Sequence, residues 1–129
     1  MRLLFDTHCW LWLQTQPERF GAQTLALLED EGNELLLSAA SSWEMSIKYA
    51  MGKLPLPEPP QTYVPSRMAT SGTQGLPITH DHALRVATLP RHHRDPFDRL
   101  LVAQCQCEGV TLLTADPVVM KYDVDIIRV

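Results

Sequence analysis

Four acidic side chains stand near points where an apolar, strand-like segment gives way to a helix. They are Asp6, Glu44, Asp98 and Asp116. The carboxyl ends of parallel strands meet at one edge of a sheet, so these carboxylates are expected to gather there. Gathered carboxylates repel one another unless a cation joins them, and such hard oxygen ligands favour Mg²⁺ or Mn²⁺. The sequence therefore predicts a divalent-metal site, whose typical chemistry is hydrolysis of a phosphodiester by an activated water.

Asp6 makes the strongest case for a bound cation. It follows the apolar residues 3–5 (LLF) and precedes residues 10–13 (WLWL), so both neighbouring segments belong to a hydrophobic core. An unpaired buried carboxylate costs several kcal/mol, even after relaxation. A metal ion is the leading candidate for the group that compensates this cost.

Helix capping is an alternative explanation for two of the acids. Ser41 and Glu44 have the spacing of a capping box, in which the glutamate reaches back to the start of its helix. Asp116 precedes Pro117, an order typical of an N-cap followed by the first helical residue. Capping explains each acid separately, but it does not explain why four such junctions all carry a carboxylate. The metal site is favoured, and capping stays open for both residues.

Two aspartates lie at the start of the helix expected over residues 96–108. Asp95 precedes a proline and is interpreted as the N-cap. Asp98 lies on the core-facing stripe of the same helix. The other members of that stripe are Leu101, Val102 and Cys105. A carboxylate on such a stripe is costly unless it faces a polar crevice, so Asp98 is predicted to be the site residue of the two.

The expected elements place these acids at one end of a sheet. Strands are predicted at residues 2–5, 34–38, 76–79, 110–114 and 126–129. Helices are predicted at residues 8–14, 22–31, 41–51, 83–89, 96–108 and 117–121. Residues 55–60 are rich in proline and indicate an extended loop, and residues 61–71 indicate a short helix that Pro65 limits. This alternation predicts an α/β fold with a central, mainly parallel sheet of about five strands flanked by helices.

Length and composition indicate one domain that spans residues 1–129. Hydrophobic residues make up 45% of the chain, which is ordinary for a globular protein. No apolar run approaches the roughly 20 residues of a membrane span and no signal peptide is recognisable, so a cytoplasmic location is expected. The three cysteines lack metal-binding spacing and are expected to be buried in a reducing compartment. A net charge of −4 argues against a protein that coats nucleic acid by bulk electrostatics, but leaves open an enzyme that binds phosphates locally.

Four segments carry a family resemblance. The chain reads DTHCWLWL at 6–13, SSWEMSIKYAMGKL at 41–54, LPRHHRDPFDRLLVAQ at 89–104 and LLTAD at 112–116. In this order the segments resemble the PIN-domain ribonucleases, and more narrowly the toxin component of VapBC-type bacterial toxin–antitoxin systems. The resemblance covers nearly the whole chain and leaves residues 55–75 undistinguished.

The resemblance implies a Mg²⁺- or Mn²⁺-dependent endoribonuclease that acts as a growth-inhibiting toxin. It makes Asp6 and Asp98 direct metal ligands, with Glu44 and Asp116 completing the cage or holding waters. It selects Asp98 over Asp95, in agreement with the helical face. It also implies a homodimer, an RNA substrate and a small antitoxin that blocks the acidic cleft, for which an inserted arginine would suit the carboxylates.

Candidate RNA contacts are Lys48, Arg94 and Arg99. For Lys48 the alternative is a helix ion pair with Glu44, and for the segment 91–94 (RHHR) it is a solvated loop. Thr7 and Thr114 resemble small hydroxyl residues that steady neighbouring carboxylates, or are ordinary turn hydroxyls. The tryptophans have apolar neighbours and are expected in the core or a dimer interface: Trp10, Trp12 and Trp43.

Two other function classes remain open. A receiver-like, phosphate-handling signalling domain is also a small α/β fold with an acidic Mg²⁺ pocket. Such domains carry adjacent acids after the first strand, whereas here only Asp6 ends it. The other class is a non-catalytic PIN-fold module that binds RNA or serves as a scaffold. The presence of all four acids argues against it.

Overall fold

The computed structural model describes residues 1–129 and contains one sheet of five parallel strands. In spatial order the strands are β3 (Thr73–Leu76), β2 (Glu34–Ser38), β1 (Arg2–Phe5), β4 (Thr111–Thr114) and β5 (Ile126–Arg128). The predicted α/β fold with a central parallel sheet is confirmed. Because β1 is the middle strand, the residue that follows it, Asp6, lies at the centre of the carboxyl edge.

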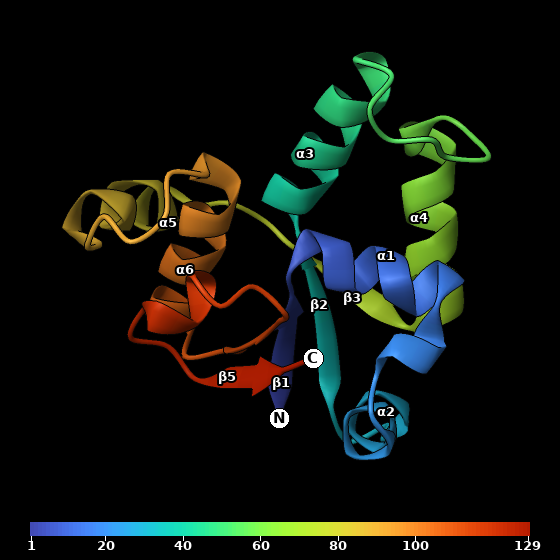
Figure 1. Cartoon of the computed structure of the whole chain (residues 1–129), viewed down its shortest axis with the longest axis horizontal. Helices are drawn as coiled ribbons and strands as arrows, with labels where there is room; N and C mark the ends of the chain where they lie inside the picture. The colour runs from blue at the N-terminus through green and yellow to red at the C-terminus, as the bar shows by residue number, and fades with distance from the viewer.

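Helices cover both faces of the sheet (Figure 1). α5 (His80–Arg85) and α6 (Pro96–Glu108) lie on one face, and α1 (Thr7–Thr15), α2 (Ala22–Glu29) and α4 (Pro60–Ser71) lie on the other. α3 (Ala39–Ala50) extends beyond the carboxyl end of β2 and contacts both α4 and α6. Three short 3₁₀ turns complete the connections, at Pro17–Arg19, Val86–Thr88 and Val119–Lys121. Side chains from α1, α3 and α6 line a hollow at the carboxyl edge of the sheet.

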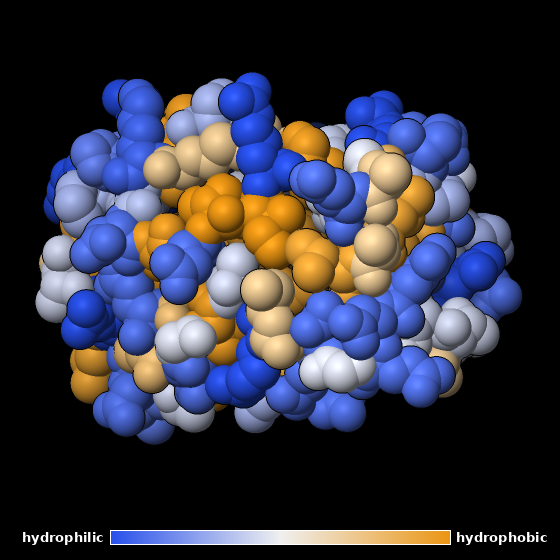
Figure 2. Space-filling model, turned by 90° about the horizontal axis from the view of Figure 1, so that it is seen from below, coloured by the Kyte–Doolittle hydropathy of each residue, from blue (hydrophilic) through white to orange (hydrophobic).

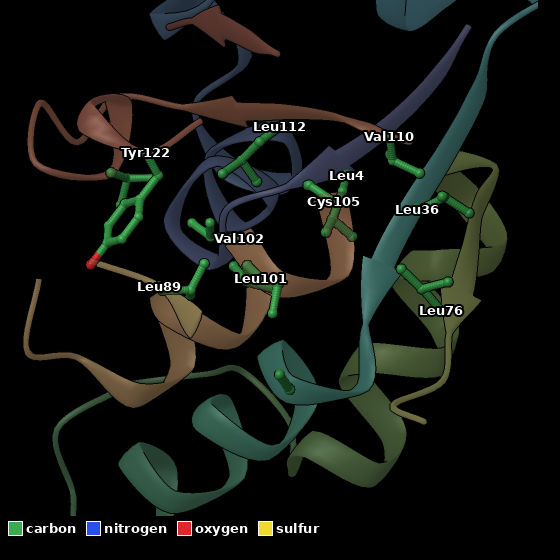
Figure 3. Close-up of a cluster of buried hydrophobic side chains, with 13 residues drawn as sticks. Leu4, Leu36, Leu76, Leu89, Leu101, Val102, Cys105, Val110, Leu112 and Tyr122 are labelled. Atoms are coloured by element: carbon green, nitrogen blue, oxygen red, sulfur yellow. The ribbon is translucent and has the colours of Figure 1, made fainter. Parts of the chain in front are cut away.

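The sheet has a hydrophobic core on each side because successive strand residues point to opposite faces. In β1, Leu4 packs in one cluster with Leu101 and Val102 of α6 (Figure 3). Leu3 and Phe5 pack in a second cluster with side chains of α1 and α4. All three strand residues are fully buried. β1 is therefore buried on both faces of the sheet, and it ends directly before Asp6, the first acid of the predicted site.

α3 begins two residues before the predicted start at residue 41, and the predicted capping box is wrong. Ser38, at the end of β2, is the N-cap, and its hydroxyl accepts a hydrogen bond from the Ala40 N–H at 3.0 Å. Ser41 therefore lies inside the helix, where it is buried. The reason is that β2 runs directly into α3, so the strand's own last residue supplies the cap. Glu44 therefore takes no part in capping α3.

The third strand lies at β3, Thr73–Leu76, and not at residues 76–79. α4 ends at Gly72, whose left-handed conformation (φ 66°) turns the chain straight into the strand. α4 itself runs for 12 residues through Pro65, which was expected to limit it. A proline removes only one backbone hydrogen bond of the helix, and the turn before it is buried against the sheet. The helix predicted at residues 117–121 is only a 3₁₀ turn at Val119–Lys121, and the one predicted at residues 83–89 is α5, His80–Arg85, followed by the 3₁₀ turn Val86–Thr88. The other predicted elements differ from the observed ones by shifts at their ends.

The tryptophans separate into a buried and an exposed class. Trp10 is fully buried, as expected, and its indole N–H donates to Thr73 at 3.3 Å. Trp12 is half-buried beside the same core. Trp43 is 58% exposed and stacks edge-to-face on Phe97, with ring centroids 5.2 Å apart. Trp43 therefore lies outside the core of the chain.

Three further observations concern the surface, the helices and the cysteines. On the N-terminal side of the sheet, apolar side chains gather across the middle of the face, with hydrophilic ones around them (Figure 2). No helix has both the length and the apolar character needed to cross a membrane. Cys9 and Cys105 are buried as expected, whereas Cys107 is exposed.

Candidate active site

The four predicted acids line a single hollow at the carboxyl edge of the sheet. Asp6 follows β1, Glu44 projects from α3, Asp98 lies in the first turn of α6, and Asp116 follows β4. The hollow has a volume of about 370 Å³. Its other lining residues are His8, Cys9, Trp12, His93, Asp95 and Ala115. The fold thus brings together carboxylates that are up to 110 positions apart in the chain (116 − 6).

Asp6 lies at the floor of the hollow, where only 6% of it is exposed. Burial raises the pKa of its carboxyl group, and the nearby Glu44 adds to the rise. The Thr114 hydroxyl opposes the rise by donating a hydrogen bond to Asp6 Oδ2 at 2.7 Å. The same hydroxyl accepts the Asp116 N–H at 3.0 Å. Thr114 therefore fixes Asp6 and the backbone of Asp116 relative to each other.

Glu44 is held by a donor on each carboxylate oxygen. The Thr7 hydroxyl lies 2.8 Å from Oε1 and 2.8 Å from the Ser41 hydroxyl, so it donates to Glu44 while it accepts from Ser41. Lys48 forms an ion pair with Oε2, one helical turn away. This hydrogen bond raises the pKa of Lys48 and keeps its ammonium charged. Lys48 therefore compensates a carboxylate that is only 3% exposed.

Asp95 is the N-cap of α6, as predicted. Its Oδ1 accepts the N–H groups of Phe97 at 2.8 Å and Asp98 at 3.3 Å. Its carboxylate nevertheless borders the hollow and adds negative charge to it. Asp95 therefore caps α6 and also raises the pKa of Asp98 by charge repulsion.

Asp98 is the most strongly perturbed acid of the site. Burial, together with repulsion by the surrounding carboxylates, raises the pKa of Asp98 to about 8. Those carboxylates belong to Asp6, Asp95, Glu44 and Asp116. The chain thus holds a carboxyl group where ionisation is unfavourable in the absence of a cation.

The pKa of Asp116 is lowered, in contrast to the raised pKa of Asp98. Burial acts to raise its pKa, but hydrogen bonds from the Val118 N–H and from His93 outweigh it and hold the pKa below the ordinary value. Oδ1 accepts the Val118 N–H at 2.8 Å, which is the capping role that the sequence left open. Oδ2 lies 3.0 Å from His93 Nε2. Asp116 therefore caps the following turn with one oxygen and faces the hollow with the other.

His93 belongs to the segment 91–94 that the sequence analysis weighed for RNA contacts, but its place among the acids was not predicted. Its Nε2 lies 3.0 Å from Asp116 Oδ2 and 3.2 Å from Asp98 Oδ2. Its Nδ1 accepts the Asp95 N–H at 3.0 Å, so in the neutral ring the proton resides on Nε2. The ligand atoms of these three side chains lie within 4.8 Å of one another, but in the neutral ring the proton on Nε2 leaves this nitrogen no lone pair for a metal ion. The proton on Nε2 makes His93 a hydrogen-bond donor that draws Asp98 and Asp116 together.

The predicted RNA contacts fall into three different settings. Lys48 is bonded to Glu44 at the acidic hollow. Arg94 is exposed in the segment before α6. Arg99 donates to the carbonyl oxygens of Pro90 and Val86 and to the Tyr122 hydroxyl. Arg94 and Arg99 line a second hollow and not the acidic one.

The donor set of the acidic hollow fits a hard divalent cation. It offers carboxylate oxygens, which are the ligands of Mg²⁺ and Mn²⁺. Burial raises the pKa of the Cys9 thiol to about 12, so this residue stays protonated and offers no thiolate for a soft metal. Burial raises the pKa values of Asp6 and Asp98, and a bound cation would favour the ionised form of both carboxyl groups.

Comparison with known proteins assigns the family. The model of the PIN domain family matches residues 3–124. The chain belongs to the PIN-domain family. Ribonuclease VapC16 of Mycobacterium tuberculosis is 52% identical to this PIN domain over 60 residues, which is 46% of this chain and 43% of that protein. The match thus spans less than half the length of this curated relative.

Solved structures with the same fold cover nearly the whole PIN domain. VapBC2 from Rickettsia felis, bound to a DNA fragment from its promoter, has a TM-score of 0.75 at 14% identity and covers 99% of this chain and 98% of that chain. VapBC-1 from nontypeable Haemophilus influenzae has a TM-score of 0.71 at 15% identity, with coverage of 99% and 98%. FitAcB from Neisseria gonorrhoeae has a TM-score of 0.64 at 22% identity, with coverage of 98% and 96%. These likenesses show the fold.

Proposed function

We propose that this protein is a Mg²⁺- or Mn²⁺-dependent endoribonuclease and the toxin of a toxin–antitoxin pair. The observation that carries the proposal is the convergence of Asp6, Glu44, Asp98 and Asp116 on one hollow at the carboxyl edge. The partial match to Ribonuclease VapC16 supports RNA as the substrate. The VapBC complexes among the structural neighbours support an antitoxin as the partner.

Asp6 and Asp98 would hold the cation directly, and Glu44 and Asp116 would complete its surroundings. When bound, such a cation polarises the phosphate, lowers the pKa of the attacking water and stabilises the departing oxygen. The chain's own groups orient the ligands. Thr114 holds Asp6, Thr7 and Lys48 hold Glu44, and His93 draws Asp98 towards Asp116. Hydrogen-bonded ligands of this kind are held in place before the substrate arrives.

The hollow also suits recognition by an antitoxin. An arginine inserted among the carboxylates would form bidentate, charge-assisted hydrogen bonds and stabilise the ionised form of Asp98, which burial and the neighbouring carboxylates disfavour. Exposed Trp43 and half-buried Phe97 form a pair that comes from α3 and α6, which both contribute acids to the hollow. This pair offers apolar surface for the antitoxin or for a second copy of the chain in a homodimer.

The proposal is tested by RNA cleavage with two matched variants. Asp98→Asn and Asp95→Asn each remove one carboxylate at the start of α6 while keeping side-chain volume. Asp98→Asn should abolish cleavage of a labelled RNA in Mg²⁺, because it removes a cation ligand. Asp95→Asn should cut RNA at a rate close to that of the wild type, since asparagine caps a helix about as well as aspartate.

Three outcomes would contradict the proposal in different ways. Near-wild-type cleavage by Asp98→Asn would reject that residue as a ligand. Complete loss in Asp95→Asn alone would reverse the roles of the two acids. Absence of cleavage by the wild type, or cleavage that persists in a chelator, would reject the metal-dependent ribonuclease. Growth arrest on expression, relieved by the product of a neighbouring small gene, tests the toxin role.

A further inference from the structure

A second hollow beside the acidic one is lined by basic side chains only. It has a volume of about 570 Å³, and its lining residues are Arg91, His93, Arg94 and Arg99. No carboxylate and no apolar residue contributes to this lining. We propose that it binds a backbone phosphate of the RNA, next to the phosphate that is cut. This inference rests on the proposed ribonuclease function and adds a substrate subsite to it.

The two hollows share a wall. His93 lines both, and its Nε2 faces Asp98 and Asp116 in the acidic hollow. A group in the basic hollow is therefore one imidazole ring away from the carboxylates. Neighbouring phosphates in an RNA strand are separated by one ribose, so one strand can present successive phosphates to the two hollows.

The charge of the chain explains why such a subsite is needed. The protein carries a net charge of −4, and its proposed reaction centre is a cluster of acids. This field repels a polyanion, even when a divalent cation offsets part of the charge. Three guanidinium groups beside the acids provide local attraction that the overall charge does not. Arginine suits this task because its planar donors match phosphate oxygens.

The structure holds the wall of the basic hollow in place. Arg99 donates to Pro90 O at 2.9 Å, Tyr122 Oη at 3.1 Å and Val86 O at 3.2 Å. The same tyrosine hydroxyl accepts the His93 N–H at 2.8 Å. Arg99 therefore acts mainly by fixing the segment that carries the other basic residues. A fixed segment loses less conformational freedom when a ligand binds.

Arg91 and Arg94 are the residues available to the phosphate. Both are exposed, and neither forms an ion pair or a side-chain hydrogen bond within the chain. Their guanidinium donors are thus free, unlike those of Arg99. A phosphate that enters the hollow can receive hydrogen bonds from these two side chains without breaking a hydrogen bond of the fold.

The test measures RNA binding and its salt dependence. A fluorescein-labelled single-stranded RNA 12-mer is titrated with protein in Mg²⁺ at several salt concentrations, with every protein carrying Asp98→Asn so that the RNA stays intact. Adding Arg91→Ala and Arg94→Ala should weaken binding about tenfold. It should also reduce the slope of log K against log salt by about 0.7 for each phosphate that is no longer neutralised. Arg91→Lys with Arg94→Lys should keep the slope, because lysine retains the charge.

The matched control removes two charges elsewhere. Lys53→Ala with Arg67→Ala changes the net charge equally, and both residues are exposed and line neither hollow. This control should keep the affinity and slope of the parent. Equal slopes for the two alanine pairs would overturn the basic subsite while leaving the proposed function intact. A wild-type chain that cuts no RNA would instead overturn the function on which the subsite rests.

Discussion

Binding of a divalent cation should release a proton from Asp98. In the cation-free protein, burial and the neighbouring carboxylates raise the pKa of Asp98 to about 8. A group with this pKa is protonated in about nine-tenths of the molecules at pH 7. Because a cation binds the ionised carboxylate, its binding at pH 7 should release about 0.9 proton from Asp98.

The affinity for the cation should follow the ionised fraction of Asp98. That fraction is about 0.01 at pH 6, about 0.09 at pH 7 and about 0.5 at pH 8. The association constant for Mn²⁺ should therefore rise about 50-fold from pH 6 to pH 8, and only about twofold from pH 8 to pH 9.

Calorimetric titration with Mn²⁺ measures the association constant directly. Repeating the titration in two buffers of different ionisation enthalpy also gives the number of protons released. Asp98→Asn should bind Mn²⁺ weakly and lose the steep dependence. Asp95→Asn should keep a steep rise but at lower pH, because Asp95 is one of the charges that raise the pKa of Asp98. A wild-type affinity that changes less than about threefold between pH 6 and pH 8, with no proton released, would refute the reasoning.

Three further predictions concern stability and ligand positioning. In a chelator, the free energy of unfolding should fall by up to about 1.4 kcal/mol per pH unit between about pH 5 and pH 8, as urea denaturation can measure. The sign follows because the folded pKa of Asp98 exceeds its ordinary value of 3.8, so the stabilisation is present at low pH and lost as the pH rises through about 8. Thr114→Val should destabilise the fold by about 1–3 kcal/mol, because it removes the donor to buried Asp6, whereas Thr111→Val should cost little; urea midpoints distinguish them. His93→Ala should lower the Mn²⁺ affinity at least about tenfold, and His93→Gln, whose amide can still donate, should retain more of it; equal calorimetric affinities for the wild type and His93→Ala would remove the positioning role.

The sequence was sufficient to predict where the acids would meet. Asp6 and Asp116 follow the neighbouring strands β1 and β4, and a parallel sheet brings the ends of its strands to one edge, so the strand pattern implies that these two acids converge. The place of Asp98 came instead from the core-facing stripe of its helix. The choice of Asp98 over Asp95 also followed from sequence, because the two residues differ in their place on the helix. The structure agrees with Asp95 as the cap and with both acids beside the hollow.

The parts that sequence did not predict depend on contacts between distant segments. His93 lies in a segment with no strand or helix period, and its role arises only because Asp116, 23 residues later, faces its ring. The spacing of Ser41 and Glu44 favours a capping box at Ser41 as one alternative, whereas the strand that runs into the helix supplies Ser38 as the cap. The sequence did contain one signal for His93, because it lies two residues before Asp95, the N-cap of α6. From that position an imidazole can accept the backbone N–H of the cap residue.

The central claim is that the acidic hollow holds a divalent cation, and anomalous diffraction from crystals soaked in Mn²⁺ tests it most directly. The account predicts a manganese peak within about 2–2.5 Å of a carboxylate oxygen of Asp6 and of Asp98. A protein that cuts RNA in Mn²⁺ but whose crystals bind manganese only away from both residues would contradict it.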